Sequence, residues 1–508
     1  MEQRERGGGL APAVVVVLVI EQRLPSVGRV DEEAVDLHLG QLGGVERPPL
    51  RFLLGERVGK AGRRSCELGD EARLFVQLAQ GALAGRLARL SPARDGVPVA
   101  SGAAPVANED LSALSPCHEH RYLVPASHGD NPRDQPVAGR VRPVRNLIRP
   151  TVEQLTPYQP GKPVEDVQRE LGLERVVKLA SNEGPFGPFP AAQEALERAA
   201  RELNRYPDGG SFRLHDALAE RHGVEHAQIA VGAGADGCID MLSQAILDPG
   251  DEVVCGWPSF PSYVIYAAKQ GAAVRTVPLV DHRYDLDALL AAVTPKTKLV
   301  YICHPNNPTG TMNTAGELDA YFERVPEHVL TVVDQAYFEY IDRPDYPDAV
   351  ERYLQAGRDV VVLRTFSKIY GLAGLRVGYA VASAGICGAL AKVRRPFDLT
   401  TPAQVAALAS VGDAAELARR RAVNAEGLAR LESILGEHGL RPVPSVGNFL
   451  FVDTGTDASS LFESLLREGV IVRPLTGFGA PTAIRVSVGT PEELGVFAAA
   501  LGRVLQTA

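Results

Sequence analysis

Apolar positions divide the chain into two unlike parts near residue 145. Beyond that point, short continuous apolar runs alternate with stretches in which apolar residues recur every three to four positions. The runs predict strands that are buried on both faces, and the periodic stretches predict amphipathic helices. Strands that alternate with helices predict an α/β fold with a mostly parallel, helix-flanked sheet. The strands are predicted at 229–231, 251–255, 272–278, 298–303, 329–334, 359–365 and 378–382.

The pattern changes again beyond about residue 400. One long helix, two isolated strands and two further helices follow, which is typical of a separate, smaller α+β domain. We therefore expect an arm at 146–190 that joins the small domain, a large domain at 191–399 and a small domain at 400–508. Further helices are predicted at 190–203, at 210–222 and up to residue 247, and the small-domain elements at 404–438, 449–453, 458–468, 484–487 and 491–505.

Residues 1–145 lack a sustained period of either kind. A strand at 14–20 and a helix at 71–90 are predicted there, while Gly, Pro and Arg interrupt the remainder. A long structureless stretch is uncommon inside a compact domain. No methionine lies between Met1 and Met241, as expected if a natural start at a valine codon near residue 141 had been overlooked. We expect 1–145 to be a disordered extension or the result of a misplaced start site.

Composition narrows the function classes. The 508 residues carry a formal net charge of −9, which does not favour a protein that coats nucleic acid. The six cysteines are scattered without a Cys-x-x-Cys pair, so neither a disulfide scaffold nor a zinc ribbon is indicated. The cluster Cys117-His118-Glu119-His120 cannot easily converge on one metal ion from adjacent positions, and we predict no metal site. The longest apolar run, 10–20, is too short to span a bilayer and is flanked by glutamates that suit a signal peptide poorly. We expect a cytoplasmic protein with no membrane or nucleic-acid partner.

Polar residues of distinct chemistry collect where the predicted strands end. Asp334 closes the strand 329–334, Lys368 follows the strand 359–365, and Asn307 follows the strand 298–303. Functional groups of open α/β sheets gather at the carboxyl ends of strands. The segment Gly234-Ala235-Asp236 opens a helix, whose N–H groups and positive dipole end suit a phosphate. His304 stands beside the turn that carries Asn307, and we interpret it as a neighbour of that turn.

This set of groups matches the needs of pyridoxal phosphate (PLP). The aldehyde of PLP requires a lysine amine to form a Schiff base. A carboxylate beside the ring nitrogen keeps that nitrogen protonated, and the phosphate requires a helix N-terminus with an arginine. Ser367 and Arg376, one and eight residues from Lys368, can complete the phosphate site.

Several ordered segments carry a resemblance to a known family. Residues 146–508, about 70% of the chain, resemble the fold-type-I PLP-dependent aminotransferases, and among them the histidinol-phosphate aminotransferases. Each segment alone is a weak signal, and their order and spacing together make a strong one. The segments are Leu155-Thr156-Pro157-Tyr158, Ser181-Asn182-Glu183, Arg205-Tyr206-Pro207, Pro305-Asn306-Asn307-Pro308-Thr309-Gly310, Val333-Asp334-Gln335-Ala336-Tyr337, Thr365-Phe366-Ser367-Lys368, Gly374-Leu375-Arg376-Val377-Gly378-Tyr379 and Ile484-Arg485-Val486-Ser487-Val488-Gly489-Thr490.

The resemblance implies a PLP-binding large domain and a role for each matching residue. Lys368 resembles the Schiff-base lysine and proton shuttle, and Asp334 resembles the partner of the ring nitrogen. Tyr337 and Asn307 match the groups that bond the 3-oxygen of PLP, and Phe260 the aromatic stacked on its ring. The residues that match the phosphate site are Ala235, Asp236, Ser367, Arg376 and, from the neighbouring subunit of a homodimer, Tyr206.

The resemblance also implies the reaction. It is transamination between glutamate/2-oxoglutarate and imidazole-acetol phosphate/L-histidinol phosphate, in histidine biosynthesis. Arg485 and Arg473 resemble the pair that binds the substrate's anionic group, with Tyr158 and Asn182 nearby. Guanidinium groups suit phosphate and carboxylate alike, so the pair does not by itself fix the substrate.

Four alternatives remain open. Aromatic-amino-acid aminotransferases and threonine-phosphate decarboxylases share nearly all of these motifs. A transcription regulator with an aminotransferase-like domain would need a basic helix-turn-helix near the front, but residues 1–145 carry 19 basic and 18 acidic side chains and no three clean successive helices. A PLP-binding protein without catalysis is disfavoured because Arg473 and Arg485 are both retained.

Overall fold

The computed structural model describes residues 34–37, 50–53, 147–155 and 161–507. Contacts within the chain define two units, Met1–Gln135 and Pro136–Ala508. In the first unit, β1 (Ala34–Leu37) pairs antiparallel with β2 (Leu50–Leu53). The strand expected at 14–20, the helix expected at 71–90 and the cluster at 117–120 lie outside the described residues.

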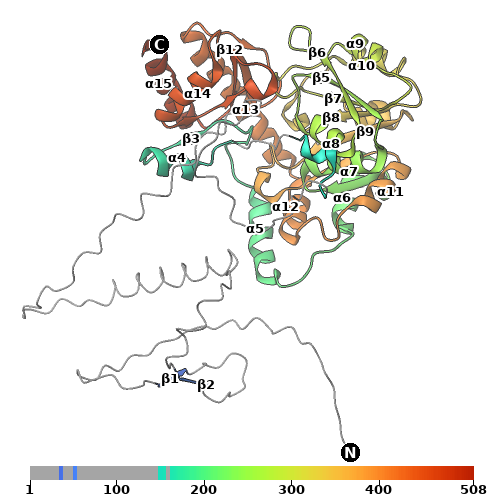
Figure 1. The fold of residues 1–508 in the computed structure, drawn as a ribbon, viewed down its shortest axis with the longest axis horizontal. Coiled ribbons are helices and arrows are strands. Elements are labelled where there is room, and N and C mark those ends of the chain that lie inside the picture. The colour runs from blue at the N-terminus through green and yellow to red at the C-terminus, as the bar shows by residue number, and fades with distance from the viewer. Residues whose placement is uncertain (1–33, 38–49, 54–146, 156–160, 508) are drawn as a thin grey trace, which may run out of the picture. The chain divides into compact units, whose positions relative to one another are not determined.

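A seven-stranded sheet is the larger layer of the second unit (Figure 1). Its order is β4-β10-β9-β8-β7-β5-β6. Strand β10 runs antiparallel to both neighbours, and the other neighbouring pairs are parallel, which confirms the expected α/β class. The strands are β4 (Ile229–Gly232), β5 (Glu252–Trp257), β6 (Ala273–Pro278), β7 (Thr297–Cys303), β8 (Leu330–Asp334), β9 (Val360–Thr365) and β10 (Gly378–Val381).

Helices shield this sheet from water, which explains its apolar sequence. All six residues of β9 are buried, as are six of the seven in β7, because parallel strands flanked by helices lose both faces to the core. Helix α7 begins directly after β4 and contacts β4, β9 and β10. The helices that contact the sheet include α6 (Phe212–His222), α7 (Gly234–Ile246), α8 (Ser262–Gln270), α9 (Leu286–Ala291), α10 (Ala315–Phe322) and α11 (Ala384–Val393).

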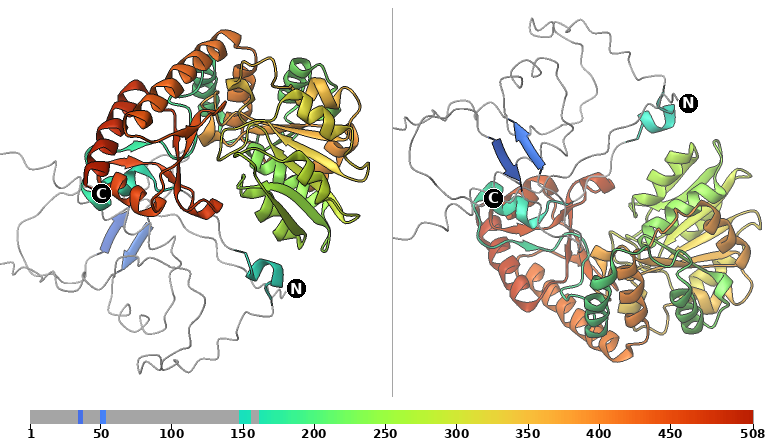
Figure 2. Two further views of the ribbon diagram at one scale, coloured as in Figure 1. Left: turned by 90° about the horizontal axis from the view of Figure 1, so that it is seen from above. Right: turned by 90° about the horizontal axis from the view of Figure 1, so that it is seen from below.

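A smaller antiparallel sheet forms a second core (Figure 2, orange to red). Its order is β11-β12-β15-β14, and helices α14 and α15 pack beside it. The arm contributes β3 (Val177–Lys178), which pairs parallel with β13 (Val470–Ile471), so Val177 and Leu179 join this core. The other elements are β11 (Pro442–Val443), β12 (Phe449–Asp453), α14 (Ala458–Arg467), β14 (Arg473–Pro474), β15 (Ala483–Ser487) and α15 (Pro491–Thr507).

The prediction of one continuous helix at 404–438 is wrong. Two helices occupy this region, α12 (Thr401–Val411) and α13 (Ala414–Glu437). The break lies at Gly412 and Asp413, where the Asp413 side chain accepts a hydrogen bond from the backbone N–H of Glu416 and caps α13. Helix α12 contacts α5 (Pro190–Ala199) and α6, which pack beside the large sheet. Helix α13 runs from the core of the large sheet to the core of the small sheet.

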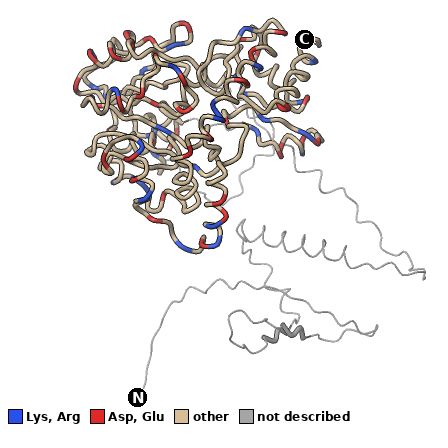
Figure 3. Tube along the Cα trace, turned by 180° about the vertical axis from the view of Figure 1, so that it is seen from behind, with Lys and Arg blue, Asp and Glu red and all other residues tan. Residues whose placement is uncertain are grey.

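Apolar and charged residues are mixed along the described part of the chain. No helix there is both long enough and apolar enough to cross a membrane. Lys and Arg are interspersed with Asp and Glu along the coloured trace (Figure 3), so this view of the described residues contains no continuous basic stripe.

Candidate active site

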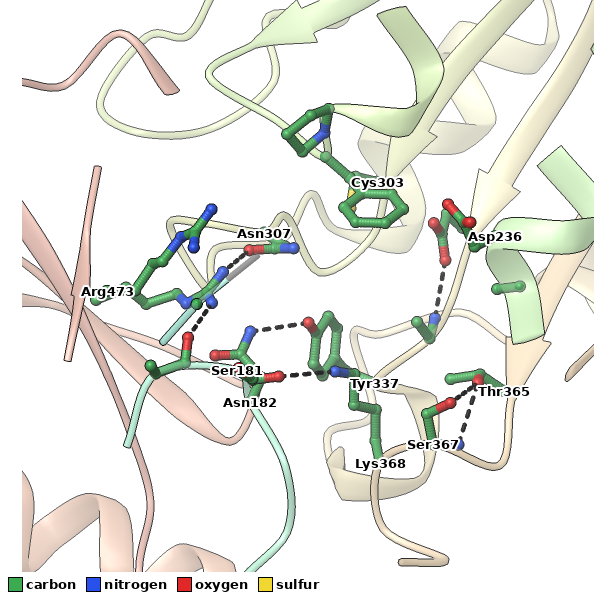
Figure 4. A pocket seen from close by; sticks show the side chains of 18 of the residues that line it. Ser181, Asn182, Asp236, Cys303, Asn307, Tyr337, Thr365, Ser367, Lys368 and Arg473 are labelled. Carbon is green, nitrogen blue, oxygen red and sulfur yellow. Dashed lines mark hydrogen bonds between the residues drawn. The ribbon is translucent and has the colours of Figure 1, made fainter. Parts of the chain in front are cut away.

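A cavity of about 200 Å³ lies at the carboxyl ends of β7, β8 and β9 (Figure 4). Side chains from β14 and β15 of the small sheet complete its wall. Twelve of the fourteen residues predicted for the site line this cavity: Asn182, Ala235, Asp236, Phe260, Asn307, Asp334, Tyr337, Ser367, Lys368, Arg376, Arg473 and Arg485.

Lys368 is the amine of the cavity. It follows β9 and its Nζ donates a hydrogen bond to the carbonyl oxygen of Ser181, at 3.2 Å. Its Nζ also lies 5.5 Å from the centre of the Tyr337 ring. Removal of the amine from water and, to a smaller extent, the nearby Arg485 guanidinium lower the pKa of Lys368 to about 7. A substantial fraction of this amine is therefore neutral and nucleophilic near pH 7.

Asp334 is the buried carboxylate of the same cavity. It ends β8 and is 4% exposed. Burial raises the pKa of Asp334, while the hydrogen bond that it accepts from the Tyr263 hydroxyl, at 2.6 Å, works in the opposite direction. The backbone N–H of Ala336 donates to its other oxygen, at 3.1 Å. Two donors thus hold a carboxylate in position for a cationic partner.

The start of α7 forms an anion site at one end of the cavity. The first N–H groups of a helix have no partner within the helix and lie at its positive end. The Asp236 carboxylate accepts hydrogen bonds from Ser262, at 2.5 Å, and Tyr266, at 2.7 Å. These bonds occupy the carboxylate, so Asp236 would offer an anion its backbone N–H.

Two glycines permit close packing around this anion site. A Cβ on Gly234, where φ is +78°, would lie 2.8 Å from Nη2 of Arg376. A Cβ on Gly378 would lie 2.4 Å from the backbone nitrogen of Ala235. The Arg376 guanidinium in turn donates to Oγ of Ser367, at 3.4 Å. Backbone, hydroxyl and guanidinium donors therefore converge on a space that a larger residue at either position would fill.

Two arginines form a second cationic group at the opposite end. Arg473 of β14 and Arg485 of β15 are direct partners in the strand register. Arg485 is buried and donates to the side chain of Asn307 and to the carbonyl oxygen of Ala180, the latter at 2.7 Å. Like charges directly opposite each other destabilise a sheet, and an anion bound between them would relieve that repulsion. In Figure 4, Tyr337 lies between Arg473 and the Asp236 end.

Tyr337 and Asn182 form the floor between the two ends. The Asn182 amide donates to the Tyr337 hydroxyl, at 2.9 Å. Both side chains are buried, and burial raises the pKa of Tyr337. Its phenol therefore stays protonated and can donate a hydrogen bond. Phe260 follows β5 and packs edge-on against Tyr263, with ring centres 5.7 Å apart.

Of the two remaining predicted residues, one is not described and the other lies away from the cavity in this chain. Tyr158 lies outside the described residues. Tyr206 is 82% exposed and stacks on Phe397, with ring centres 4.6 Å apart. His304, interpreted as a neighbour of the turn, is buried against Tyr346 and donates to the carbonyl oxygen of Asn313, at 2.7 Å.

Sequence reasoning missed some contributors. Ser181 takes part through its backbone carbonyl, for which no side-chain pattern exists. Tyr263 holds Asp334 although it lies 71 positions away in sequence. Its place in the segment that carries Phe260 is the signal that could have identified it. Thr365 also lines the cavity and donates to Oγ of Ser367, at 3.0 Å.

Comparison with known proteins gives consistent matches. The sequence profile of aminotransferase class I and II matches residues 174–501. The chain is 45% identical over 358 residues to a histidinol-phosphate aminotransferase of Moorella thermoacetica, covering 70% of this chain and 92% of that protein. It is 48% identical over 353 residues to the protein of that name from Akkermansia muciniphila, covering 69% and 96%.

Solved structures give the same result. A histidinol-phosphate aminotransferase from Sinorhizobium meliloti, in complex with pyridoxal-5'-phosphate, matches with a TM-score of 0.65 and 32% identity, covering 71% of this chain and 98% of that one. An aspartate aminotransferase double mutant from Thermus thermophilus matches with a TM-score of 0.63 and 26% identity, covering 70% and 99%.

Proposed function

The chain belongs to the class I and II aminotransferase family, and from that premise we propose that it is a PLP-dependent histidinol-phosphate transaminase. It moves an amino group between glutamate/2-oxoglutarate and imidazole-acetol phosphate/L-histidinol phosphate, in histidine biosynthesis. Relatives named histidinol-phosphate aminotransferase at 45–48% identity support this substrate pair. The observation that carries the proposal is that Lys368 and Asp334 line one cavity with a cationic group at each end.

The cavity fits PLP on three counts. Lys368 supplies an amine whose pKa of about 7 suits attack on an aldehyde. The buried Asp334 supplies a carboxylate that lacks a cationic partner among its hydrogen-bond donors, which are Tyr263 and Ala336. The anion site at the start of α7, where Gly234 leaves room for a ligand, offers helix N–H groups and Arg376 to a phosphate. Together they would hold the aldehyde, the ring nitrogen and the phosphate of the cofactor.

The residues of the cavity have separate roles in the proposed reaction. Bound PLP supplies an electron sink for the substrate's α-carbon. Asp334 would hold a proton at the ring nitrogen, and Tyr337 and Asn307 would bond the 3-oxygen. Lys368 is placed to take and return the α-carbon proton, because its lowered pKa lets it exist in both forms near neutrality.

Arg473 and Arg485 bind the anionic end of the substrate. Their cross-strand register presents two guanidinium groups to one anion. The phosphate of histidinol phosphate would carry more charge than a carboxylate and would gain more from both. Asn182 lies beside Tyr337 between the two ends and would contribute to the substrate contact surface.

Competing half-reactions test this proposal. The PLP-loaded enzyme is mixed with L-histidinol phosphate, phenylalanine or threonine phosphate, and the change in visible absorbance is followed. We expect conversion by histidinol phosphate to exceed conversion by phenylalanine by at least about 100-fold in kcat/KM, one guanidinium–phosphate contact being sufficient for that factor. Equal rates with phenylalanine would contradict the substrate assignment, and carbon dioxide release from threonine phosphate would indicate a decarboxylase.

The proposal includes a homodimer with Tyr206 at its interface. Tyr206 and Phe397 stack on the surface, and Phe212 nearby in sequence is 60% exposed. Exposed apolar side chains of this size favour a partner surface. We propose that Tyr206 reaches the cofactor phosphate of the second subunit. Light scattering should give twice the chain mass, and Tyr206→Phe should weaken PLP binding without dissociating the dimer.

A further inference from the structure

We propose that Ser487 is a positioning residue, which orients the Asn182 amide so that the Tyr337 hydroxyl directs its hydrogen into the cavity. Ser487 does not line the cavity and acts through two intermediaries. The inference rests on the proposed function, because Tyr337 is assigned there to the 3-oxygen of PLP.

Ser487 contacts Asn182 twice. The backbone N–H of Asn182 donates to Oγ of Ser487, at 2.8 Å, and the Ser487 hydroxyl donates to Oδ1 of Asn182, at 3.1 Å. The Asn182 backbone is left-handed, with φ of +53°, and the Asn448 amide donates to its carbonyl oxygen, at 3.1 Å. Side chains from the small domain thus hold the backbone and the amide of one arm residue.

This arrangement decides which atom of the amide faces Tyr337. With Oδ1 accepting from Ser487, the Nδ2 group donates to the Tyr337 oxygen. The hydroxyl hydrogen of Tyr337 is then not used by Asn182 and can donate into the cavity. A flipped amide would place an acceptor opposite Tyr337 and would draw that hydrogen away from the cavity.

The flipped amide is disfavoured because of Ser487. Ser487 is 2% exposed, and its hydroxyl donates to Oδ1 of Asn182. In the flipped state the hydroxyl hydrogen would face an NH2 group instead of an acceptor. A buried donor left without an acceptor is costly, so Ser487 selects the orientation that leaves Tyr337 a donor toward the cavity.

The expected consequence is spectroscopic. A hydrogen bond donated to the 3-oxygen favours its anionic form and lowers the pKa of the visible chromophore of bound PLP. Tyr337→Phe removes that donor and should raise the apparent pKa of the absorbance band by roughly one unit. Ser487→Ala lets both amide orientations compete and should raise it by roughly half a unit.

The experiment is a double-mutant cycle read by absorbance against pH. Wild type, Ser487→Ala, Tyr337→Phe and the double variant are loaded with PLP and titrated. We expect the double variant to match Tyr337→Phe, because Ser487 acts only through Tyr337. Ser487→Thr keeps the hydroxyl and should restore the wild-type pKa, and thermal melting verifies that each variant folds.

Two results would overturn the inference. One is an unchanged chromophore pKa in folded Ser487→Ala alongside a raised pKa in Tyr337→Phe. The other is a full Ser487→Ala shift on top of Tyr337→Phe, which would mean a route that bypasses the phenol. Failure of the proposed function looks different, because wild type would then develop no visible absorbance with PLP.

Discussion

The two cationic ends of the cavity are built in contrasting ways. At the α7 end, backbone N–H groups, the Ser367 hydroxyl and one arginine converge around a spacing fixed by Gly234 and Gly378. At the other end, two guanidinium groups project from neighbouring strands of the small sheet. The first end belongs to the core of the large sheet and the second to a different core.

The contrast teaches how one site can separate a constant ligand from a variable one. A cradle made from backbone atoms has a fixed shape and suits a single phosphate. Long side chains can rearrange and can serve either phosphate or carboxylate. In the proposed function, the constant ligand is PLP and the variable ligand is the substrate. Each prediction below removes a group from one end, or from between them.

Lys368→Ala removes the amine between the two ends and should have the largest effect. Turnover should fall by about 10⁴-fold or more, because nucleophile and proton relay are lost together. The visible absorbance of PLP bound through the amine should disappear as well. The measurement is steady-state transamination combined with an absorbance spectrum, and full activity in the variant is incompatible with the mechanism.

Asp334→Asn tests the other central group. The amide keeps the size of the side chain but cannot hold a proton at the ring nitrogen, so kcat should fall by roughly 10³-fold. Tyr263→Phe is the matched variant, since it retains the carboxylate and removes its 2.6 Å donor. We expect a smaller loss there. An Asp334→Asn enzyme with wild-type kcat would refute the assigned role.

Arg376→Ala and Arg473→Ala compare the ends directly. Each loses one charge-assisted contact, for which about 30-fold in affinity is typical. Arg376→Ala should raise the Kd for PLP and leave the substrate KM nearly unchanged at saturating PLP. Arg473→Ala should do the reverse. Calorimetry with PLP gives the Kd, and steady-state kinetics with histidinol phosphate give the KM. If both variants weakened PLP binding and substrate binding alike, the proposed division between the two ends would be wrong.

The pH dependence of PLP capture gives the smallest effect. The Lys368 amine attacks only when neutral, so with a pKa of about 7 the capture rate should rise about tenfold per pH unit below 7 and level off above it. Glu183 raises this pKa and Arg376 lowers it. In stopped-flow measurements, the pH at which the capture rate levels off should therefore fall in Glu183→Gln and rise in Arg376→Ala. A capture rate that levels off only near pH 10 would exclude a lowered pKa for Lys368.

The strands of the large sheet could be predicted because burial on both faces leaves a continuous apolar run. Strands β7 and β9 each differ by one residue at their start from the predicted range. The break between α12 and α13 escaped because apolar residues continue through it. Asp413 followed by Glu416 is a capping signal that would have revealed the second start. Strands β3, β13 and β14 have two residues each, too few to show a period.

The site residues could be named from motifs, but their connections could not. Lys368 and Asp334 carry their chemistry in their side chains. The Ser181 carbonyl accepts from Lys368 across 187 positions, and the Ser487 hydroxyl contacts Asn182 across 305 positions. Such contacts depend on tertiary packing, which local spacing does not encode.

The reversed direction of β10 has a consequence for the reach of the chain. A parallel strand after β9 would begin at the opposite end of the sheet, where β9 starts. Because β10 runs antiparallel to β9, the twelve-residue connection 366–377 leaves and re-enters the sheet at the same end, so it brings both Lys368 and Arg376 to the cavity. The connection therefore fixes the span between the Lys368 amine and the Arg376 guanidinium. Lengthening it should mis-set that span while leaving both cores intact.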